Sequence, residues 1–249
     1  TGVQTCALPI WVHNYERKMS MYEEIKEQMV DVCHKMWLKG WVAANDGNIT
    51  VKVGEGKYLA TQTGMSKAFI TTKNIGLIDD DFKILEAEPG FKPSSEVKMH
   101  LRCYHDRPDV GAVVHAHPPT ATGFACAQIP LDDYCMIETV IVVGSIPLTP
   151  YGTPSTYEVP EAIAPYLQEH DVMLLENHGA LTVGADLITA YYRMETLELQ
   201  AQISLNARLL GGVKDVDREN IDKLIAMRPA YGVTGKHPGY KKYKNKYTE

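Results

Sequence analysis

The sequence predicts one α/β domain, in which a mixed or antiparallel sheet is covered by helices. Strand-like segments recur along the chain, and segments with helical spacing of apolar residues lie between them. The chain has 249 residues, of which 45% are hydrophobic and 22% charged, so it can bury a large core. No internal repeat or linker divides it.

The first half of the chain is expected to form one helix and three strands. In residues 21–39, apolar side chains recur every three or four positions, and Gly40 can end the helix. Residues 49–53 alternate between apolar and polar side chains, as a half-buried strand does, and residues 58–61 form the return strand after a glycine turn. Residues 75–78 form another short strand, which leads into an acidic turn.

The second half is expected to alternate between helices and strands. Ser94 or Ser95 can cap a helix that runs to residue 106 and ends before Pro108. The apolar run at residues 110–115 is typical of a buried strand. By the same criteria, further helices are expected at residues 120–128, 157–169, 185–210 and 216–227, and further strands at 140–143, 172–176 and 180–183.

Composition and charge exclude several classes of protein. The net charge of −6 gives no sign of a nucleic-acid or membrane-surface partner. No apolar run approaches the roughly 20 residues of a membrane-spanning helix. The five cysteines are widely spaced and form no C-x-x-C pair, which argues against a disulfide framework and favours a reducing, cytoplasmic location.

Three segments are distinguished along the chain. Residues 1–18 are expected to be a non-native or disordered leader, because the first residues show no periodicity and no signal-peptide pattern; Met19 or Met21 would then be the natural start. Residues 19–235 are expected to form the single folded domain, which carries the motifs described below. Residues 236–249 carry five lysines and three tyrosines and are expected to be a basic, solvated tail.

Three histidines are candidate metal ligands. His115 and His117 stand two apart at the end of an apolar strand, so both side chains point to the same side. His178 lies in a tight turn before Gly179, between two strand-like segments. Imidazole nitrogens suit zinc, and three histidines leave a fourth position open, as in catalytic sites. Taken alone, the pair is more often incidental, and a turn histidine often only bonds the backbone.

Glu96 and several small polar residues are candidates for the rest of the site. At a helix N-terminus the Glu96 carboxylate is stabilised by the helix dipole and could act as a ligand or a base, although capping alone would also explain it. Hydroxyls and backbone N–H groups at turns and helix N-termini can cradle phosphate. Candidates for that role are Gly47, Asn48, Thr63, Gly64, Ser94 and Ser95.

Taken in order, these motifs resemble the class II aldolase/adducin family. The resemblance extends from about residue 21 to residue 231, and the combination of motifs is specific although no single one is. The matching strings are Asp46-Gly47-Asn48-Ile49-Thr50, Thr63-Gly64-Met65, Pro93-Ser94-Ser95-Glu96, Arg107-Pro108-Asp109, Val113-Val114-His115-Ala116-His117 and Asn177-His178-Gly179.

The resemblance implies a fold, a metal and an assembly. The implied fold is a single α/β/α domain with a central, mainly antiparallel sheet covered by helices. Members form fourfold homotetramers with active sites between subunits. The implied cofactor is one zinc ion per subunit, held by His115, His117 and His178. Glu96 would be the fourth ligand of the empty site and the proton-transferring base once substrate displaces it.

The resemblance also assigns roles to substrate-binding residues. Gly47, Asn48, Thr63, Gly64, Ser94 and Ser95 match the phosphate-binding positions. Tyr134 matches a tyrosine that reaches into the neighbour's site, and Tyr231 matches a mobile C-terminal tyrosine. His100 recurs four residues after the glutamate and is expected to pack rather than to bind metal. Residues 137–144, which include Glu138, and the stretch after Tyr231 depart from the family pattern, which leaves the aldehyde specificity open.

The reaction that the resemblance implies is reversible cleavage of a ketose 1-phosphate into dihydroxyacetone phosphate and an aldehyde. L-Fuculose 1-phosphate, which would give L-lactaldehyde, is the leading substrate. Another sugar-phosphate lyase, a dehydratase of the methylthioribulose-phosphate type or a 4-epimerase could use the same metal site; Glu96 in place of the epimerases' usual aspartate favours the aldolase. A non-catalytic adducin-like binding module is a further alternative, which the histidine triad disfavours.

Overall fold

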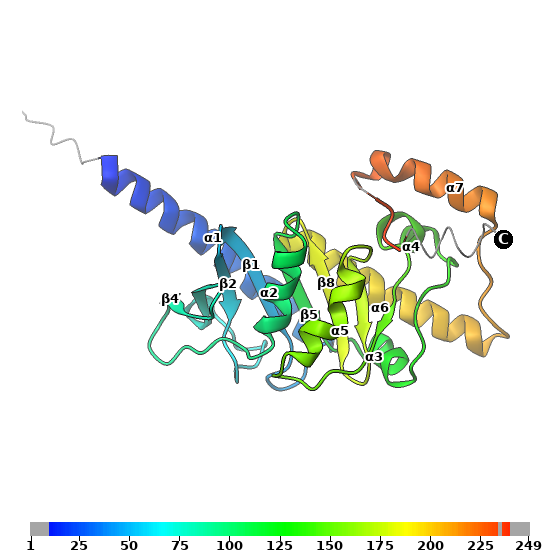
Figure 1. The fold of residues 1–249 in the computed structure, drawn as a ribbon, viewed down its shortest axis with the longest axis horizontal. Helices are drawn as coiled ribbons and strands as arrows, with labels where there is room; N and C mark the ends of the chain where they lie inside the picture. Colours follow the sequence, from blue (N-terminus) through cyan, green and yellow to red (C-terminus); the bar gives the residue numbers. More distant parts are fainter. Residues whose placement is uncertain (1–9, 234–235, 240–249) are drawn as a thin grey trace, which may run out of the picture.

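The structure is a computed structural model that describes residues 10–233 and 236–239 (Figure 1). Its centre is an eight-stranded sheet with the strand order β4-β3-β2-β1-β5-β8-β7-β6. All neighbouring strands pair antiparallel except β6 and β7, which are parallel. The expected α/β class with a mainly antiparallel sheet is therefore confirmed.

The strands follow the predicted apolar segments closely. They are β1 (Asn48–Gly54), β2 (Lys57–Thr61), β3 (Ile75–Asp79), β4 (Ile84–Glu86), β5 (Ala112–Ala116), β6 (Leu148–Thr149), β7 (Val172–Leu175) and β8 (Gly179–Gly184). The sequence did not predict β4 and β6. All three residues of β4 are exposed, and β6 has only two residues, so neither carries an alternating apolar pattern.

Helices cover both faces of the sheet. They are α1 (Ile10–Leu38), α2 (Val97–Asp106), α3 (Pro119–Cys126), α4 (Ile137–Val142), α5 (Glu158–Leu167), α6 (Leu187–Leu209) and α7 (Arg218–Met227), with short 3-10 helices η1 (Thr72–Asn74) and η2 (Arg228–Tyr231). In Figure 1, α2 and α5 lie in front of the sheet and α6 lies behind it.

The alternation of side chains along β5 produces two cores. Val114 packs into the core under α1, α3 and α6, whereas Val113 packs into the opposite core under α2 and α5. Leu59 of β2 belongs to the first core and Ile163 of α5 to the second. This three-layer arrangement holds the ends of the central strands rigidly, and the candidate site lies at one of those ends.

The prediction of a strand at residues 140–143 was wrong, because most of these residues belong to α4. Helical hydrogen bonds run from Val140 N to Met136 O (3.1 Å) and from Val143 N to Thr139 O (3.0 Å). Val140 packs with Tyr134 and Ile221 in a small separate core beneath α7. Short apolar runs do not distinguish strand from helix, and tertiary packing here overrides the β-propensity of valine and isoleucine.

The structure describes the two terminal segments only in part. Helix α1 begins at Ile10, so it includes residues 10–18 of the expected leader; that these residues are non-native stays a prediction, and residues 1–9 lie outside the described residues. Residues 237–239 are buried, and the His237 ring bonds the Val140 carbonyl oxygen (2.9 Å); residues 240–249, the rest of the expected tail, lie outside the described residues. Of the helices in the described part of the chain, none is both long and apolar enough for a bilayer crossing.

Truncating a core side chain tests the packing of the sheet. Leu59 is 0% exposed, whereas Leu85 is 42% exposed. Leu59→Ala should lower the free energy of unfolding by about 2–5 kcal/mol, because it removes buried contacts and leaves a cavity. Leu85→Ala should lower it by less than about 1 kcal/mol. Urea unfolding measures both, and equal losses would contradict the arrangement.

Candidate functional site

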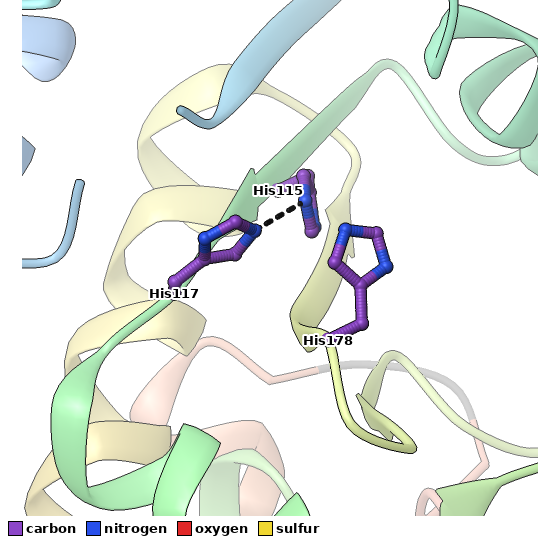
Figure 2. Close-up of side chains that lie close together, drawn as sticks. All are labelled: His115, His117 and His178. Carbon is purple, nitrogen blue, oxygen red and sulfur yellow. Dashed lines mark hydrogen bonds between the residues drawn. The ribbon is translucent and has the colours of Figure 1, made fainter. Parts of the chain in front are cut away.

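The pairing of three central strands brings the predicted histidines together. His115 lies near the end of β5, opposite Asn48 of β1, and β5 also pairs with β8, where Ala116 lies opposite Ala180. His117 follows β5, and His178 lies in the turn that precedes β8. Because β5 and β8 are antiparallel, the end of one strand meets the beginning of the other. Figure 2 shows the three rings facing one another.

The distances define a compact cluster. Ligand atoms of the three histidines all lie within 4.8 Å of one another. The Nε2 atoms of His115 and His117 are 3.1 Å apart (Figure 2). The Glu96 carboxylate joins the cluster, with Oε2 3.3 Å from His115 Nε2 and Oε1 3.1 Å from His178 Nε2. Four groups from three distant segments therefore surround one point.

These residues could hold a metal ion. His115 Nδ1 lies 2.9 Å from the carbonyl oxygen of Ala180, to which only an N–H can donate, so Nε2 keeps its lone pair for the cluster. His117 Nδ1 lies 3.5 Å from Asp46 Oδ2, an arrangement that favours the same tautomer. Ligands of a tetrahedral zinc ion lie about 3.3 Å apart, since zinc–nitrogen bonds are about 2.0–2.1 Å long. Three of the observed spacings, 3.1–3.3 Å, match this value, and the remaining spacings between histidine ligand atoms are at most 4.8 Å.

The electrostatics of the cluster also suit a cation. Burial raises the pKa of Glu96, but the imidazoles of His115 and His178 outweigh this effect and hold the pKa well below its usual value. Burial, together with His115 and His178, lowers the pKa of His117 to about 3. A neutral imidazole and an ionised carboxylate are the forms that bind metal.

Helix α2 and strand β1 position Glu96. The residue is the N-cap of α2, and its carboxylate points away from the helix into the cluster instead of capping it. Asn48 Nδ2 donates to Glu96 Oε2 (3.1 Å) and approaches Ser94 Oγ at 3.4 Å. Asn48 is buried and stands opposite His115 in the sheet. It therefore fixes the carboxylate relative to the histidines.

His100 lies behind the cluster and is not part of it. Its ring is 0% exposed, and Nδ1 lies 2.9 Å from Thr50 Oγ1. Burial, and to a lesser degree the charge of His115, lowers the pKa of His100 to about 3, so this ring is neutral. The group of histidines that could share an ion does not include it, in agreement with the expected packing role.

A polar cavity of about 230 Å³ opens beside the cluster. Glu96, His117 and His178 line it, together with five of the six residues predicted to bind phosphate: Gly47, Asn48, Thr63, Ser94 and Ser95. The sixth, Gly64, has φ +69° and turns the chain directly after Thr63 without lining the cavity. The predicted phosphate residues thus lie next to the predicted metal ligands.

Sequence reasoning missed other residues of this cavity. Asp46, Gln62 and Ser155 also line it. Ser155 has a φ of +69°, its Oγ lies 2.7 Å from Ser95 Oγ, and its carbonyl accepts from Lys98 Nζ (2.9 Å). The only sequence signal for this loop was its run of small polar residues, which predicts a turn but not its position beside α2.

Two glycines permit the close backbone packing of the site. A Cβ atom on Gly179 would lie 2.5 Å from His117 Cδ2 and 2.6 Å from the Ala116 carbonyl oxygen. Gly47 has φ +71°, and a Cβ there would lie 3.0 Å from the His115 carbonyl oxygen. Larger residues would therefore displace the chain that carries the histidines.

The two predicted tyrosines lie elsewhere in the single chain. Tyr134 is 1% exposed and stacks on the His237 ring, with 5.9 Å between ring centroids. Tyr231 is 60% exposed and lines a separate cavity of about 920 Å³ together with Arg107. Neither lines the histidine cavity. Their roles in a neighbouring subunit's site stay predictions.

Removing one imidazole should abolish tight metal binding. We expect about one divalent ion per wild-type chain and a loss of affinity above about 100-fold in His117→Ala, because three strong ligands become two. His105→Ala removes a half-exposed histidine outside the cluster and serves as the control. Elemental analysis after dialysis against a weak chelator measures both. Full retention of metal by His117→Ala would exclude this ligand set.

A smaller change should also weaken the metal site. Gly179→Ala places a methyl group against His117 and should lower metal affinity by about tenfold or more. Gly123→Ala, in α3, meets nothing within 4 Å and should leave metal affinity unchanged. Competition with a fluorescent chelator compares the two variants; equal affinities would contradict the close packing described.

The chain is similar to known proteins in sequence and in fold. The sequence-family model described as the class II aldolase and adducin N-terminal domain matches residues 27–205 of this chain. A protein named L-fuculose phosphate aldolase from Methanocaldococcus jannaschii is 31% identical over 180 residues, covering 72% of this chain and 95% of that protein. A 3-oxo-tetronate 4-phosphate decarboxylase from Escherichia coli strain K12 is 30% identical over 186 residues, covering 73% of this chain and 86% of that protein.

A solved structure agrees with these matches. The structure named L-fuculose 1-phosphate aldolase matches with a TM-score of 0.75 at 27% identity, covering 82% of this chain and 95% of that one. The region that matches the family model includes Glu96 and all three clustered histidines. The chain belongs to the class II aldolase and adducin family.

Proposed function

We propose that this protein is a zinc-dependent aldolase that reversibly cleaves L-fuculose 1-phosphate into dihydroxyacetone phosphate and L-lactaldehyde. The observation that carries the proposal is the position of Glu96, whose carboxylate lies within 3.3 Å of both His115 and His178 at the edge of a polar cavity. The names of relatives about 30% identical to this chain support the reaction class.

The proposed reaction breaks the bond between the α and β carbons of the ketone. The β-hydroxyl proton leaves as that carbon becomes an aldehyde, and the bonding electron pair stays on the α carbon. Its charge spreads onto the neighbouring carbonyl oxygen as an enediolate, and a proton added to the α carbon gives dihydroxyacetone phosphate. The site must therefore stabilise negative charge on an oxygen and move protons.

The chain's own residues divide these tasks. His115, His117 and His178 would hold the zinc ion, with Glu96 as a fourth ligand until substrate enters. When bound, the ion supplies Lewis-acid stabilisation of the developing oxygen charge. Glu96 would accept or return the proton at the α carbon, and Asn48, bonded to its Oε2, keeps the carboxylate within reach. A Schiff-base lysine is not required.

The polar cavity would bind the phosphate end of the substrate. Thr63, Ser94 and Ser95 offer hydroxyl groups, and the turns at Gly47 and Gly64 offer backbone N–H groups. Binding energy gained at this remote group orients the reacting carbons. The chemistry of the lining thus supports a sugar-phosphate substrate.

We also propose a homotetramer with active sites between subunits. Tyr134 would donate to the aldehyde oxygen in the neighbour's site, and Tyr231 would close over it. In the single chain, Tyr134 is buried beside α4 and α7, so this role requires that region to rearrange upon assembly. Size-exclusion chromatography with light scattering tests the assembly directly.

A second candidate is decarboxylation of a 3-oxo acid phosphate. A relative of this chain, 30% identical, is named 3-oxo-tetronate 4-phosphate decarboxylase. Loss of carbon dioxide from such a substrate also leaves an electron pair beside a carbonyl, and the same carbon must then gain a proton. The same donor set would serve both reactions, so the two candidates differ only in the group that leaves.

Turnover with a defined substrate tests the proposal. Zinc-loaded wild-type protein should release dihydroxyacetone phosphate from L-fuculose 1-phosphate, and Glu96→Gln should lower kcat about 10²–10⁴-fold, because proton transfer is lost. Glu161→Gln, in the exposed first turn of α5, is the control and should keep full activity. A coupled reductase assay measures the product. If L-fuculose 1-phosphate gives no dihydroxyacetone phosphate but 3-oxo-tetronate 4-phosphate releases carbon dioxide, the decarboxylase is favoured.

A further inference from the structure

Lys67 is a buried lysine that the roles assigned above leave unexplained. Its side chain is only 1% exposed, and Nζ donates one hydrogen bond, to the Met65 carbonyl oxygen (3.2 Å). An ammonium group has three donors, and lysine is almost never fully buried unless it is paired. Within the described residues, no carboxylate forms an ion pair with it. Such a group costs stability, which calls for a compensating role.

The position of Lys67 connects it to the polar cavity. The preceding turn contributes Gln62 and Thr63 to the cavity wall. On one side this turn is held by the bond from Thr63 N to the Lys92 carbonyl oxygen (2.9 Å). On the other side it is held by the bond from Lys67 to Met65. Lys67 is thus buried and holds the segment that directly follows these two residues of the cavity wall.

The charge of Lys67 is poorly compensated when the cavity holds no anion. Burial lowers its pKa, and the neighbouring Cys33 and Asp46 only partly oppose this effect. Asp46 lines the cavity and also approaches His117 at 3.5 Å, so its charge is shared. Because interactions between charges are stronger in the protein interior than in water, an anion bound in the cavity would gain from the buried ammonium.

We propose that Lys67 is a positioning residue for the phosphate group of the substrate. It holds the turn at Thr63 and Gly64 in place and supplies a buried positive charge behind the cavity wall. This inference rests on the proposed function and deepens it: the preferred ligand is a phosphate monoester dianion. Lys67 does not touch the reacting carbons, so it affects binding rather than the chemical step.

Lys67→Met tests the inference because it keeps the length and apolar stem of the side chain and removes the charge. Calorimetry with inorganic phosphate should show binding weakened about tenfold or more. With sugar phosphate, KM should rise by a similar factor and kcat should stay within about threefold, since binding to substrate and transition state is lost equally. Metal content should not change. Lys73→Met removes an exposed lysine and should match wild type.

Thermal stability separates this role from a purely structural one. Replacing an unpaired buried charge by an apolar side chain should leave Tm unchanged or raised. A Lys67→Met variant that is destabilised or unfolded, or that binds phosphate as wild type does, would overturn the inference. If wild-type protein neither binds inorganic phosphate nor turns over sugar phosphates, the proposed function itself fails. If wild type and Lys67→Met bind inorganic phosphate equally well, only the role of Lys67 is rejected.

Discussion

The structure depends on one contact set, in which three imidazoles and one carboxylate surround a common point. His115 and His117 come from the end of β5, His178 from the turn before β8, and Glu96 from the start of α2. Each segment is fixed by a different element, so the site requires the sheet, its register and the packing of α2 to be correct together. A one-residue slip of β5 would turn His115, and His117 directly after the strand, to the opposite face.

Several residues around this point are locally unfavourable, but they allow the site residues to come close together. Gly47 and Gly179 lack side chains, which lets the backbone at these positions pack closely against the segment that carries His115 and His117. Asn48 is buried, and its amide group donates to Glu96. Lys67 is buried with a single hydrogen-bond acceptor. Unfavourable choices of this kind concentrate where a protein binds ligands, and here Gly47 and Asn48 line the polar cavity while Gly179 packs against its lining residue His117.

The sequence predicted the parts of the fold that have a strong period, and it missed the parts that depend on tertiary contacts. The alternation in β1 and the apolar run of β5 identified the central strands, which placed His115 and His117 at a strand end. The helix at α4 was mistaken for a strand, because its β-branched residues are held by a small core that no local pattern reveals. Ser155 and Lys67 were missed because no local pattern shows that one lines the cavity and that the other is buried beside Met65.

X-ray absorption spectroscopy at the zinc edge of the zinc-loaded protein tests the central claim most directly. The account predicts three imidazole nitrogens and one oxygen at about 2.0–2.1 Å, with one imidazole lost in His178→Ala. A shell with sulfur ligands at about 2.3 Å, or a wild-type spectrum with fewer than three imidazoles, would contradict it.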